Sequence, residues 1–401
     1  MESFSNWLPH SGSGYFLMEA IFASFAGITA LVLFILIRRA RRRSYFRRHD
    51  RQAFTIRKQW REILSGAVDS GFWRGDPMRR AIVQDFVLRE LDAASPKGRP
   101  CLQEFMRANG MLDTCIAQAR KGRAWQRRNA LVTLGATLMP EAIPVLAEAL
   151  DDRHMETRLA AVRGLGRTGL GQAAEPILER LMTDELQVPA HPVSNALLRC
   201  CEEHPEVLLP YLRRAHGEVR EILARVAAEI ALPQMADEIL LLAGDPLQEV
   251  RASSARALAV VPLPLALPAL AGLVRDPVWF VRLRAVASLD SLRHPRTILT
   301  LLEALCDANR FVRLRAAAAL SEFIKERTHI LESVVDSHDR YALHAMISAL
   351  ELGGNFGKVL DDLSDPAQHD AAATRLRDAL REGAANLWCA EPADPVLEGQ
   401  I

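Results

Sequence analysis

The stretch DPVWFVRLRAVASL at residues 276–289 recurs as DANRFVRLRAAAAL at residues 307–320, which defines a 31-residue step. A single globular core gives no reason for two nearly identical stretches, whereas a chain built from repeated structural units does. The first question is therefore whether this step continues through the rest of the chain.

The 31-residue step, taken from the central arginine of the motif, falls on arginine at six of seven positions between residues 127 and 313. The exception is Pro189, and an eighth, degraded unit follows near Asp339 and His344. Six residues before the arginine, four of the units carry an aspartate. The arginines are Arg127, Arg158, Arg220, Arg251, Arg282 and Arg313, and the aspartates are Asp152, Asp245, Asp276 and Asp307.

Each unit predicts two helices. The aspartate, followed by proline in two units, predicts a turn that caps the second helix. In that helix Val281, Ala285 and Leu289 recur every four residues and therefore share one apolar face. The first helix carries another apolar face and often opens with proline. These prolines are Pro144, Pro176, Pro210 and Pro268.

A helical pair of this size cannot bury its apolar face alone, so we expect the units to stack into a solenoid. The pattern P-x-L-x-x-L, then D-P, then V-R-x-x-A-x-x-L resembles HEAT repeats, and the 31-residue step resembles their phycobilisome-lyase-like subclass. The resemblance covers residues 118–352. It implies an all-α fold, a right-handed α-solenoid of helical hairpins, and a protein-binding scaffold.

Two interpretations of the arginine column remain open. In the first, the arginines form a strip that grips an acidic peptide. In the second, which the resemblance favours, the arginines and aspartates form a structural ladder between successive turns and helices. The planar guanidinium fork suits such bridging. Pro189 interrupts the column and predicts a distorted unit or a bend between Val188 and Cys201.

The position two residues before the repeated arginine forms a second column, in which the residue type changes from charged to aromatic along the chain. It holds glutamate in three units but Phe280 and Phe311 in two others, and Trp279 adjoins the first of these. If exposed, these rings form an interface hot spot bordered by arginine; the alternative is burial under a neighbouring loop. The predicted partner-binding residues are Trp279, Phe280, Arg284, Arg310, Phe311 and Arg315.

Residues 15–37 contain one charge in 23 positions and predict a transmembrane helix, because about 20 apolar residues span the hydrocarbon core. A cleaved signal peptide is disfavoured, since the positive charges follow the apolar run and no small-residue cleavage site appears. A stripe of small residues allows homo-association through this helix, while Glu19 is expected simply to reach water. The stripe comprises Ala20, Ala23, Ser24, Gly27 and Ala30.

A basic juxtamembrane segment, residues 38–61, follows the predicted span. By the positive-inside rule it places the amino terminus, residues 1–14, outside an inner (plasma) membrane of bacterial type and the bulk of the chain in the cytoplasm. Residues 1–61 hold eleven Lys and Arg against three Asp and Glu, and the remainder holds thirty-nine against forty-six. We therefore expect contact with anionic lipid headgroups and no nucleic acid partner. The membrane-surface arginines are Arg38, Arg39, Arg41, Arg42, Arg43, Arg47 and Arg48.

The flanks of the repeats give weaker signals. Phe54, Ile56, Trp60 and Ile63 suggest that the basic segment continues as an interfacial helix. Residues 62–117 have an irregular helical periodicity and predict a helical linker and an atypical N-terminal cap. Residues 353–401 predict a C-terminal cap helix at 366–381 and a poorly ordered tail from residue 382.

No catalytic, cofactor-binding or metal-binding residue is assigned. The six cysteines form no C-x-x-C pair and are expected to be core thiols, and no phosphate-binding loop or hydrolase elbow is present. The sequence predicts a membrane-anchored scaffold or adaptor, not an enzyme, that tethers or regulates a membrane-associated protein partner. The alternatives are a lyase related to the phycobilisome lyases and an accessory subunit of a membrane glycosyltransferase complex.

Overall fold

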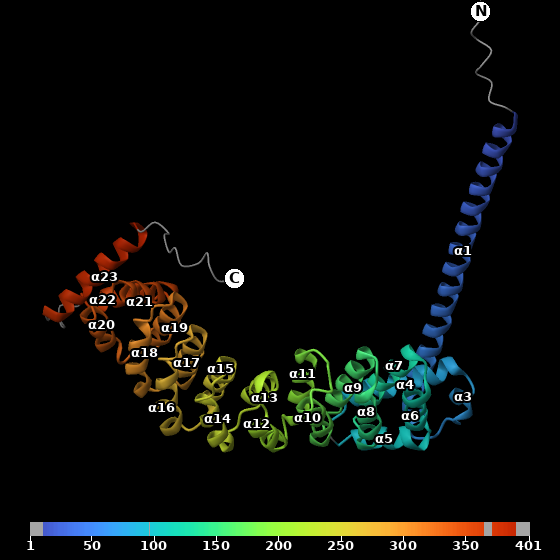
Figure 1. The fold of residues 1–401 in the computed structure, drawn as a ribbon, viewed down its shortest axis with the longest axis horizontal. Helices are drawn as coiled ribbons and strands as arrows, with labels where there is room; N and C mark the ends of the chain where they lie inside the picture. Colours follow the sequence, from blue (N-terminus) through green and yellow to red (C-terminus); the bar gives the residue numbers. More distant parts are fainter. Residues whose placement is uncertain (1–10, 96, 365–370, 390–401) are drawn as a thin grey trace, which may run out of the picture. The chain divides into compact units, whose positions relative to one another are not determined.

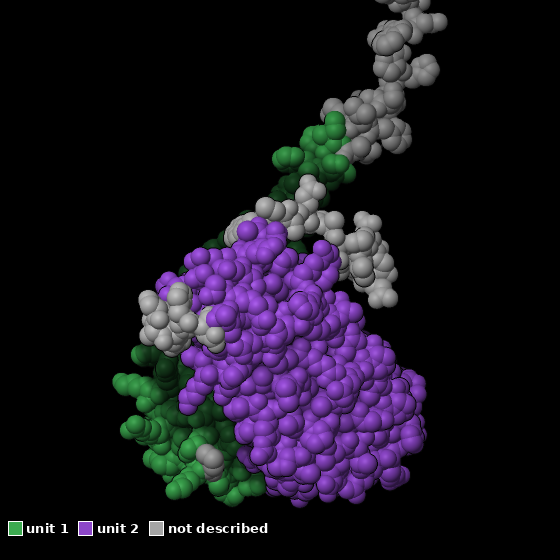
Figure 2. Space-filling model, turned by 90° about the vertical axis from the view of Figure 1, so that its left-hand side faces the viewer, with its two compact units in different colours: residues 1–117 green, residues 118–401 purple. Residues whose placement is uncertain are grey.

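The described part of the chain, residues 11–95, 97–364 and 371–389, consists of helices joined by turns and contains no strand. Within this part, the computed structural model describes the side chains of residues 21–95, 97–364 and 371–386. Two compact units are present, residues 1–117 and 118–401 (Figure 2). The prediction of an all-α fold is confirmed.

Unit 1 begins with α1 (Ser11–Lys58), one continuous helix of 48 residues. Its side chains from Ile21 to Ile37 are uncharged, mostly apolar and exposed, and by length and composition the helix could cross a membrane. The helix does not stop at the predicted membrane edge but continues through the seven arginines, all of which are exposed. The predicted outer segment through residue 10, and the side chain of Glu19, lie outside the described residues.

The rest of unit 1 packs around the end of α1. Ile56 and Ile63 are buried, and the Trp60 ring lies 5.6 Å from that of Phe86. The expectation of an interfacial helix is therefore wrong for these three residues, because α4 covers the α1 end; only Phe54 stays exposed. The predicted helical linker and cap consist of packed helices. They are α2 (Trp60–Leu64), α3 (Gly71–Arg74), α4 (Pro77–Ala93), α5 (Arg99–Ala108) and α6 (Met111–Lys121).

Unit 2 is a row of helical hairpins in two layers (Figure 1). The first helices are α8 (Ile143–Glu148), α10 (Ala174–Met182), α12 (Leu209–Arg214), α14 (Ala236–Ala243), α16 (Leu263–Leu273), α18 (Ile298–Leu305) and α20 (Arg327–Asp336). The second helices are α7 (Ala124–Ala136), α9 (Met155–Thr168), α11 (Ala190–Cys201), α13 (Gly217–Glu229), α15 (Gln248–Ala257), α17 (Trp279–Leu292), α19 (Arg310–Ser321) and α21 (Arg340–Leu352).

Short 3₁₀ turns lead into or out of several of these helices. They are η1 (Pro140–Ala142), η2 (Ala149–Asp151), η3 (Gly171–Ala173), η4 (Pro205–Val207), η5 (Pro233–Met235), η6 (Leu258–Val260) and η7 (Pro295–Thr297). One predicted helix start is wrong: Pro268 lies inside α16, because that helix begins a turn earlier and carries Pro264 in its first turn.

The second helices pack closely because their shared face carries small side chains. Val281, Ala285 and Leu289 are fully buried, as the four-residue spacing predicts. The helices α7 and α9, at the start of unit 2, approach each other even more closely. A Cβ on Gly135 would lie 2.3 Å from the carbonyl oxygen of Gly164. Second helices contact each other more extensively than first helices do, and they lie on the inner side of the curve of unit 2 (Figure 1).

The unit around Pro189 departs from the regular step. α11 begins at Ala190, whereas a step of 31 from Met155 predicts residue 186. The turn before it is correspondingly long and holds Asp184 and Gln187 at positive φ, 57° and 41°. Proline fixes its own φ and restricts the residue before it, so the helix starts only after this position.

The prediction that the repeated aspartates cap the second helix is wrong. Each carboxylate accepts a hydrogen bond from the backbone N–H two residues later, at 2.7–2.9 Å, and that residue directly precedes the second helix. The aspartate therefore braces the turn and does not cap the helix itself. The four acceptors are Asp152, Asp245, Asp276 and Asp307, and their donors are His154, Leu247, Val278 and Asn309.

The solenoid closes with α22 (Phe356–Asp362) and α23 (Ala371–Cys389). Leu376 and Leu380 of α23 are buried, and the helix packs against α20 and α21. The predicted poorly ordered tail is wrong for residues 382–389, because Gly383 fits closely against Leu343 and Ile347 of α21. Residues 365–370 and 390–401 lie outside the described residues.

Candidate partner-binding surface

The arginine column forms a ladder of ion pairs between successive repeats. Each pairing joins an arginine to the aspartate that follows it at a 25-residue spacing. The closest N–O distances are 2.5–2.8 Å. In the later units the same guanidinium also donates to a backbone carbonyl of its own turn, as Arg251 does to Asp245 at 2.9 Å. The pairs are Arg127–Asp152, Arg220–Asp245, Arg251–Asp276 and Arg282–Asp307.

Two arginines lack a carboxylate partner in this ladder, and the same spacing explains both. The residue at that spacing after Arg158 is Thr183, and the Arg158 guanidinium instead bonds the carbonyl oxygens of Leu186 and Gln187 at 2.9 and 3.2 Å. The residue at that spacing after Arg313 is His338, and Arg313 lies over the ring of Tyr341 at 5.1 Å.

The side chains of Arg251, Asp276 and Arg282 are partly withdrawn from water, and their pKa values are shifted by the ladder. Burial raises the pKa of Asp276, but the hydrogen bonds from Arg251 and the Val278 amide outweigh it, so that pKa lies below its ordinary value. The hydrogen bond to Asp276 raises the pKa of Arg251, and Asp307 does the same for Arg282. Arg251 and Asp276 therefore stay charged through the neutral range.

Aromatic side chains gather at the first turns of α17, α19 and α21. The ring centroid of Trp279 lies 6.0 Å from Phe280 on its own helix and 6.0 Å from Phe311 on the next. Trp279 is 39% exposed, Phe311 52% and Tyr341 51%, so these rings are not buried under a loop. We call Trp279, Phe280, Phe311 and Tyr341 the aromatic row.

Sequence reasoning missed Tyr341. It holds the same second position of its helix as Phe280 and Phe311, but the step from Phe311 is one residue shorter than the regular step, which therefore passes over it. Aligning the units on their helix starts would have found it. Trp125, 70% exposed, occupies the corresponding position in α7, and glutamates fill it in α9, α13 and α15.

The arginines around the aromatic row differ in their engagement. Arg315 pairs with Asp290 at 2.7 Å, and Arg340 lies over the Tyr341 ring at 4.7 Å. Arg284 and Arg310 are exposed and have no ion pair or hydrogen bond within the part of the chain described by the structure. The carboxylates of Asp276 and Asp307, before α17 and α19, are occupied by the ladder. Asp339, before α21, accepts hydrogen bonds from the backbone N–H groups of Tyr341 and Ala342. The unpaired positive charge of Arg284 and Arg310 is therefore on α17 and α19.

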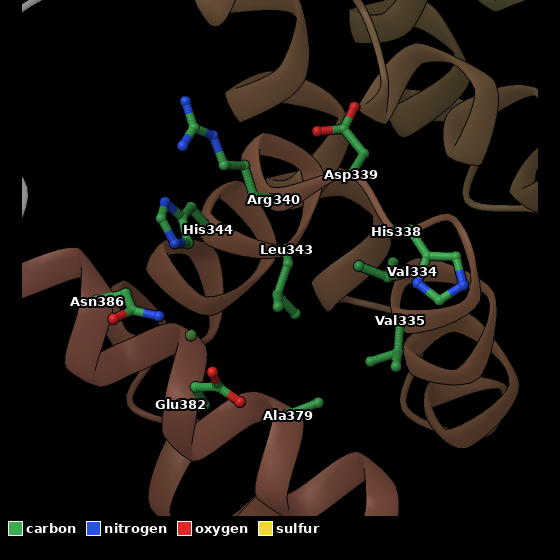
Figure 3. A pocket seen from close by; sticks show the side chains of 11 residues that line it. Val334, Val335, His338, Asp339, Arg340, Leu343, His344, Ala379, Glu382 and Asn386 are labelled. Atoms are coloured by element: carbon green, nitrogen blue, oxygen red, sulfur yellow. The ribbon is translucent and has the colours of Figure 1, made fainter.

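A pocket of about 280 Å³ is lined by residues of α20, α21, α23 and the turn before α21 (Figure 3). Its apolar wall comes from Val334, Val335, Leu343 and Ala379, and its polar rim comes from the turn before α21, from α21 and from α23. Arg340 belongs both to this rim and to the Tyr341 contact, so the pocket continues the aromatic row. The polar rim consists of His338, Asp339, Arg340, His344, Glu382 and Asn386.

Reactive chemistry has little support among the described side chains. They contain no group of three or more His, Cys, Asp or Glu that could hold a metal ion. Burial raises the pKa of the Cys200 thiol to about 12 and that of Cys201 to about 11, so neither thiol forms a reactive thiolate near neutrality. Cys101 and Cys306 are exposed, which corrects the expectation that the cysteines are core thiols.

The fold and the ladder define the chain as an α-solenoid of helical hairpins. Family models for HEAT repeats match residues 112–191, 205–290 and 272–351, more than half of the chain. The chain therefore belongs to the HEAT-repeat family. No curated protein sequence matches it.

Several solved structures are similar to this chain. A mutant of the karyopherin Kap121p is 13% identical, with 83% of this chain and 43% of that chain covered and a TM-score of 0.45. Human deoxyhypusine hydroxylase is 19% identical, covering 69% and 99%, with a TM-score of 0.27. A designed armadillo repeat protein in complex with the peptide (KR)4 is 18% identical, covering 53% and 99%, with a TM-score of 0.29. Such likenesses concern the fold alone.

Proposed function

We propose that this HEAT-repeat protein is a scaffold that binds a partner protein at the aromatic row. The observation that carries the proposal is the contact of Trp279 with Phe311 across two repeats while both rings remain exposed. Clustered exposed aromatics next to arginine have the composition of protein interface hot spots. The uncompensated charge of Arg284 and Arg310 adds attraction for an acidic partner surface.

Anchoring at a membrane is the second part of the proposal. The apolar stretch of α1 is long enough to span a bilayer, and the seven arginines after it favour a cytoplasmic location for the repeats. The scaffold would then hold a membrane-associated protein near the inner membrane. The regular 31-residue step favours the phycobilisome-lyase-like subclass of HEAT repeats, without lyase activity.

Affinity capture with the full chain in detergent tests the partner proposal. The double variant Trp279→Ala, Phe311→Ala is expected to lose the captured protein, because it removes the two exposed contacting rings. The matched control is Leu241→Ala, Leu299→Ala, which removes two exposed apolar side chains from the first helices α14 and α18. Equal loss with both double variants, or capture that neither changes, would contradict the proposal.

Protease accessibility tests the proposed orientation. In closed right-side-out cells the repeats should resist added protease and become sensitive only after the membrane is opened. Replacing the seven arginines at 38–48 with alanine should reduce or reverse this protection, because they provide the topology signal. Recovery of the intact wild-type chain in the soluble fraction would contradict anchoring.

A further inference from the structure

The aromatic row also has a candidate occupant within this chain. We propose that residues 391–398, EPADPVLE, bind along the row in cis, so that a partner must displace them. This inference rests on the row being the binding surface of the proposed function, and it names the segment that competes for it. Residues 390–401 lie outside the described residues, so the argument uses their sequence and their point of attachment.

The attachment point lies beside the row. Asn386 on α23 lines the same pocket as Arg340 (Figure 3). Arg340 lies over the ring of Tyr341. Gly383 lies against α21, the helix that carries Tyr341. The helix α23 ends at Cys389, and the segment follows it directly. The segment therefore begins a few residues after Asn386, which lies at the α21 end of the row.

The length of the segment is sufficient. Neighbouring packed helices lie about 8–10 Å apart, so the three second helices of the row span about 20 Å. Twelve residues in a polyproline II conformation extend about 37 Å at about 3.1 Å per residue. The segment can thus pass from Tyr341 over Phe311 to Trp279.

The charge and spacing of the segment match the row. Residues 390–401 contain Glu391, Asp394 and Glu398 and no lysine or arginine, whereas the row exposes the unpaired guanidinium groups of Arg284 and Arg310. Glu391 and Asp394 are three residues apart, as are the two prolines at 392 and 395. Polyproline II repeats every three residues, about 9 Å, which equals the step between neighbouring helices. Proline-containing segments of this kind bind surfaces lined with aromatic rings.

Covalent attachment strengthens a weak contact. A short tether gives an effective concentration in the millimolar range. If the free segment binds with a Kd of about 0.1 mM, the tethered segment occupies the row about ten-elevenths of the time and weakens a competitor's apparent affinity about tenfold. The contact therefore restricts access to the row without closing it.

The test uses the full chain in detergent and a fluorescein-labelled peptide with the sequence of residues 390–401, read by fluorescence anisotropy. The wild-type chain is compared with a neutral-tail chain, Glu391→Gln, Asp394→Asn, Glu398→Gln. We expect the neutral-tail chain to bind the peptide about tenfold more tightly, because its own tail no longer competes. A peptide carrying the same three neutral replacements should bind neither chain.

Two further variants are made in the neutral-tail chain. Trp279→Ala with Phe311→Ala should abolish peptide binding, and Leu241→Ala with Leu299→Ala should leave it unchanged. Three results would each overturn the proposal: equal peptide affinity for the wild-type and neutral-tail chains, peptide binding that survives loss of the two rings, and no binding at 1 mM peptide. If the neutral peptide binds as the acidic peptide does, the electrostatic basis of the proposal is wrong.

The inference and the proposed function fail in distinguishable ways. If a captured partner depends on Trp279 and Phe311 but the peptide does not bind the row, the scaffold stands and the inference is wrong. If the peptide binds the row but no protein is captured there, the inference stands and the scaffold function is wrong. If both stand, the neutral-tail chain should capture more partner than the wild type.

Discussion

Arg251 and Asp276 lie in successive repeats, and the Nε of the arginine is 2.6 Å from a carboxylate oxygen of the aspartate. The same guanidinium donates to the backbone carbonyl of Asp245 in its own turn, and Asp276 accepts from the backbone N–H of Val278 in the next. One ion pair therefore fixes two turns and the distance between them. Stability in a solenoid depends on such nearest-neighbour contacts.

Breaking this pair should destabilise the repeats. Removing one partner leaves a largely buried charge without its hydrogen bonds, so Arg251→Ala is expected to cost about 2–3 kcal/mol, measured by urea unfolding of the full chain in detergent. The neighbouring pair Arg275–Glu303 provides the control, since it is exposed and Arg275→Ala should change stability little. A larger effect at Arg275 than at Arg251 would show that the ladder is not stabilising.

The same pair predicts a dependence of stability on pH. The pKa of Asp276 is lower in the folded chain than in the unfolded chain, so its contribution is complete above the unfolded pKa, near 4, and is lost as the pH falls through the folded pKa. The variant Asp276→Asn should therefore lose less stability than the wild type between pH 5 and about pH 3. Parallel pH profiles of thermal unfolding would contradict this.

Two glycine substitutions should act in opposite directions. Gly135→Ala places a Cβ 2.3 Å from the Gly164 carbonyl oxygen and forces α7 and α9 apart, at a cost of about 1–3 kcal/mol. Gly272→Ala meets no atom within 4 Å near the end of α16 and should stabilise by up to about 1 kcal/mol, because alanine favours helix. Thermal unfolding of both variants measures the difference, and a shift of the same sign in both would argue against tight packing of α7 and α9.

The aromatic row should contribute less to stability than the core behind it. Trp279 and Phe311 are exposed, so the alanine variants should each cost below about 1 kcal/mol. Leu289, fully buried in the same helix as Trp279, should cost about 2–5 kcal/mol as Leu289→Ala. Collapse of the fold in the Trp279→Ala variant would assign that ring to the core.

The repeated architecture could be predicted from the sequence because one side-chain pattern recurs at a fixed step. Val281, Ala285 and Leu289 are buried as their spacing requires. The prediction was weaker where tertiary packing competes with a local signal. Ile56 and Ile63 follow a basic stretch and suggested a lipid surface, yet they bury against helices that their own sequence does not identify.

The candidate surface was predictable only in part. The spacing placed Trp279, Phe280 and Phe311 in one column, but their exposure depends on the orientation of neighbouring helices. Tyr341 was missed because its unit is shorter by one residue. The ion pair between Arg315 and Asp290 could not be predicted from the sequence, because neither residue belongs to the Asp and Arg columns that the regular step defines.

Site-specific photocrosslinking in living cells tests the central claim most directly. The photoreactive residue p-benzoylphenylalanine replaces Phe311 in the full chain, and in a matched strain it replaces Leu299, which is 81% exposed on α18 in the other layer. We predict a discrete adduct to a second protein at position 311 that disappears when Arg310→Ala and Trp279→Ala are added, and no such adduct at position 299. The same adduct at both positions, or an adduct at position 299 alone, would contradict a partner-binding role for the aromatic row.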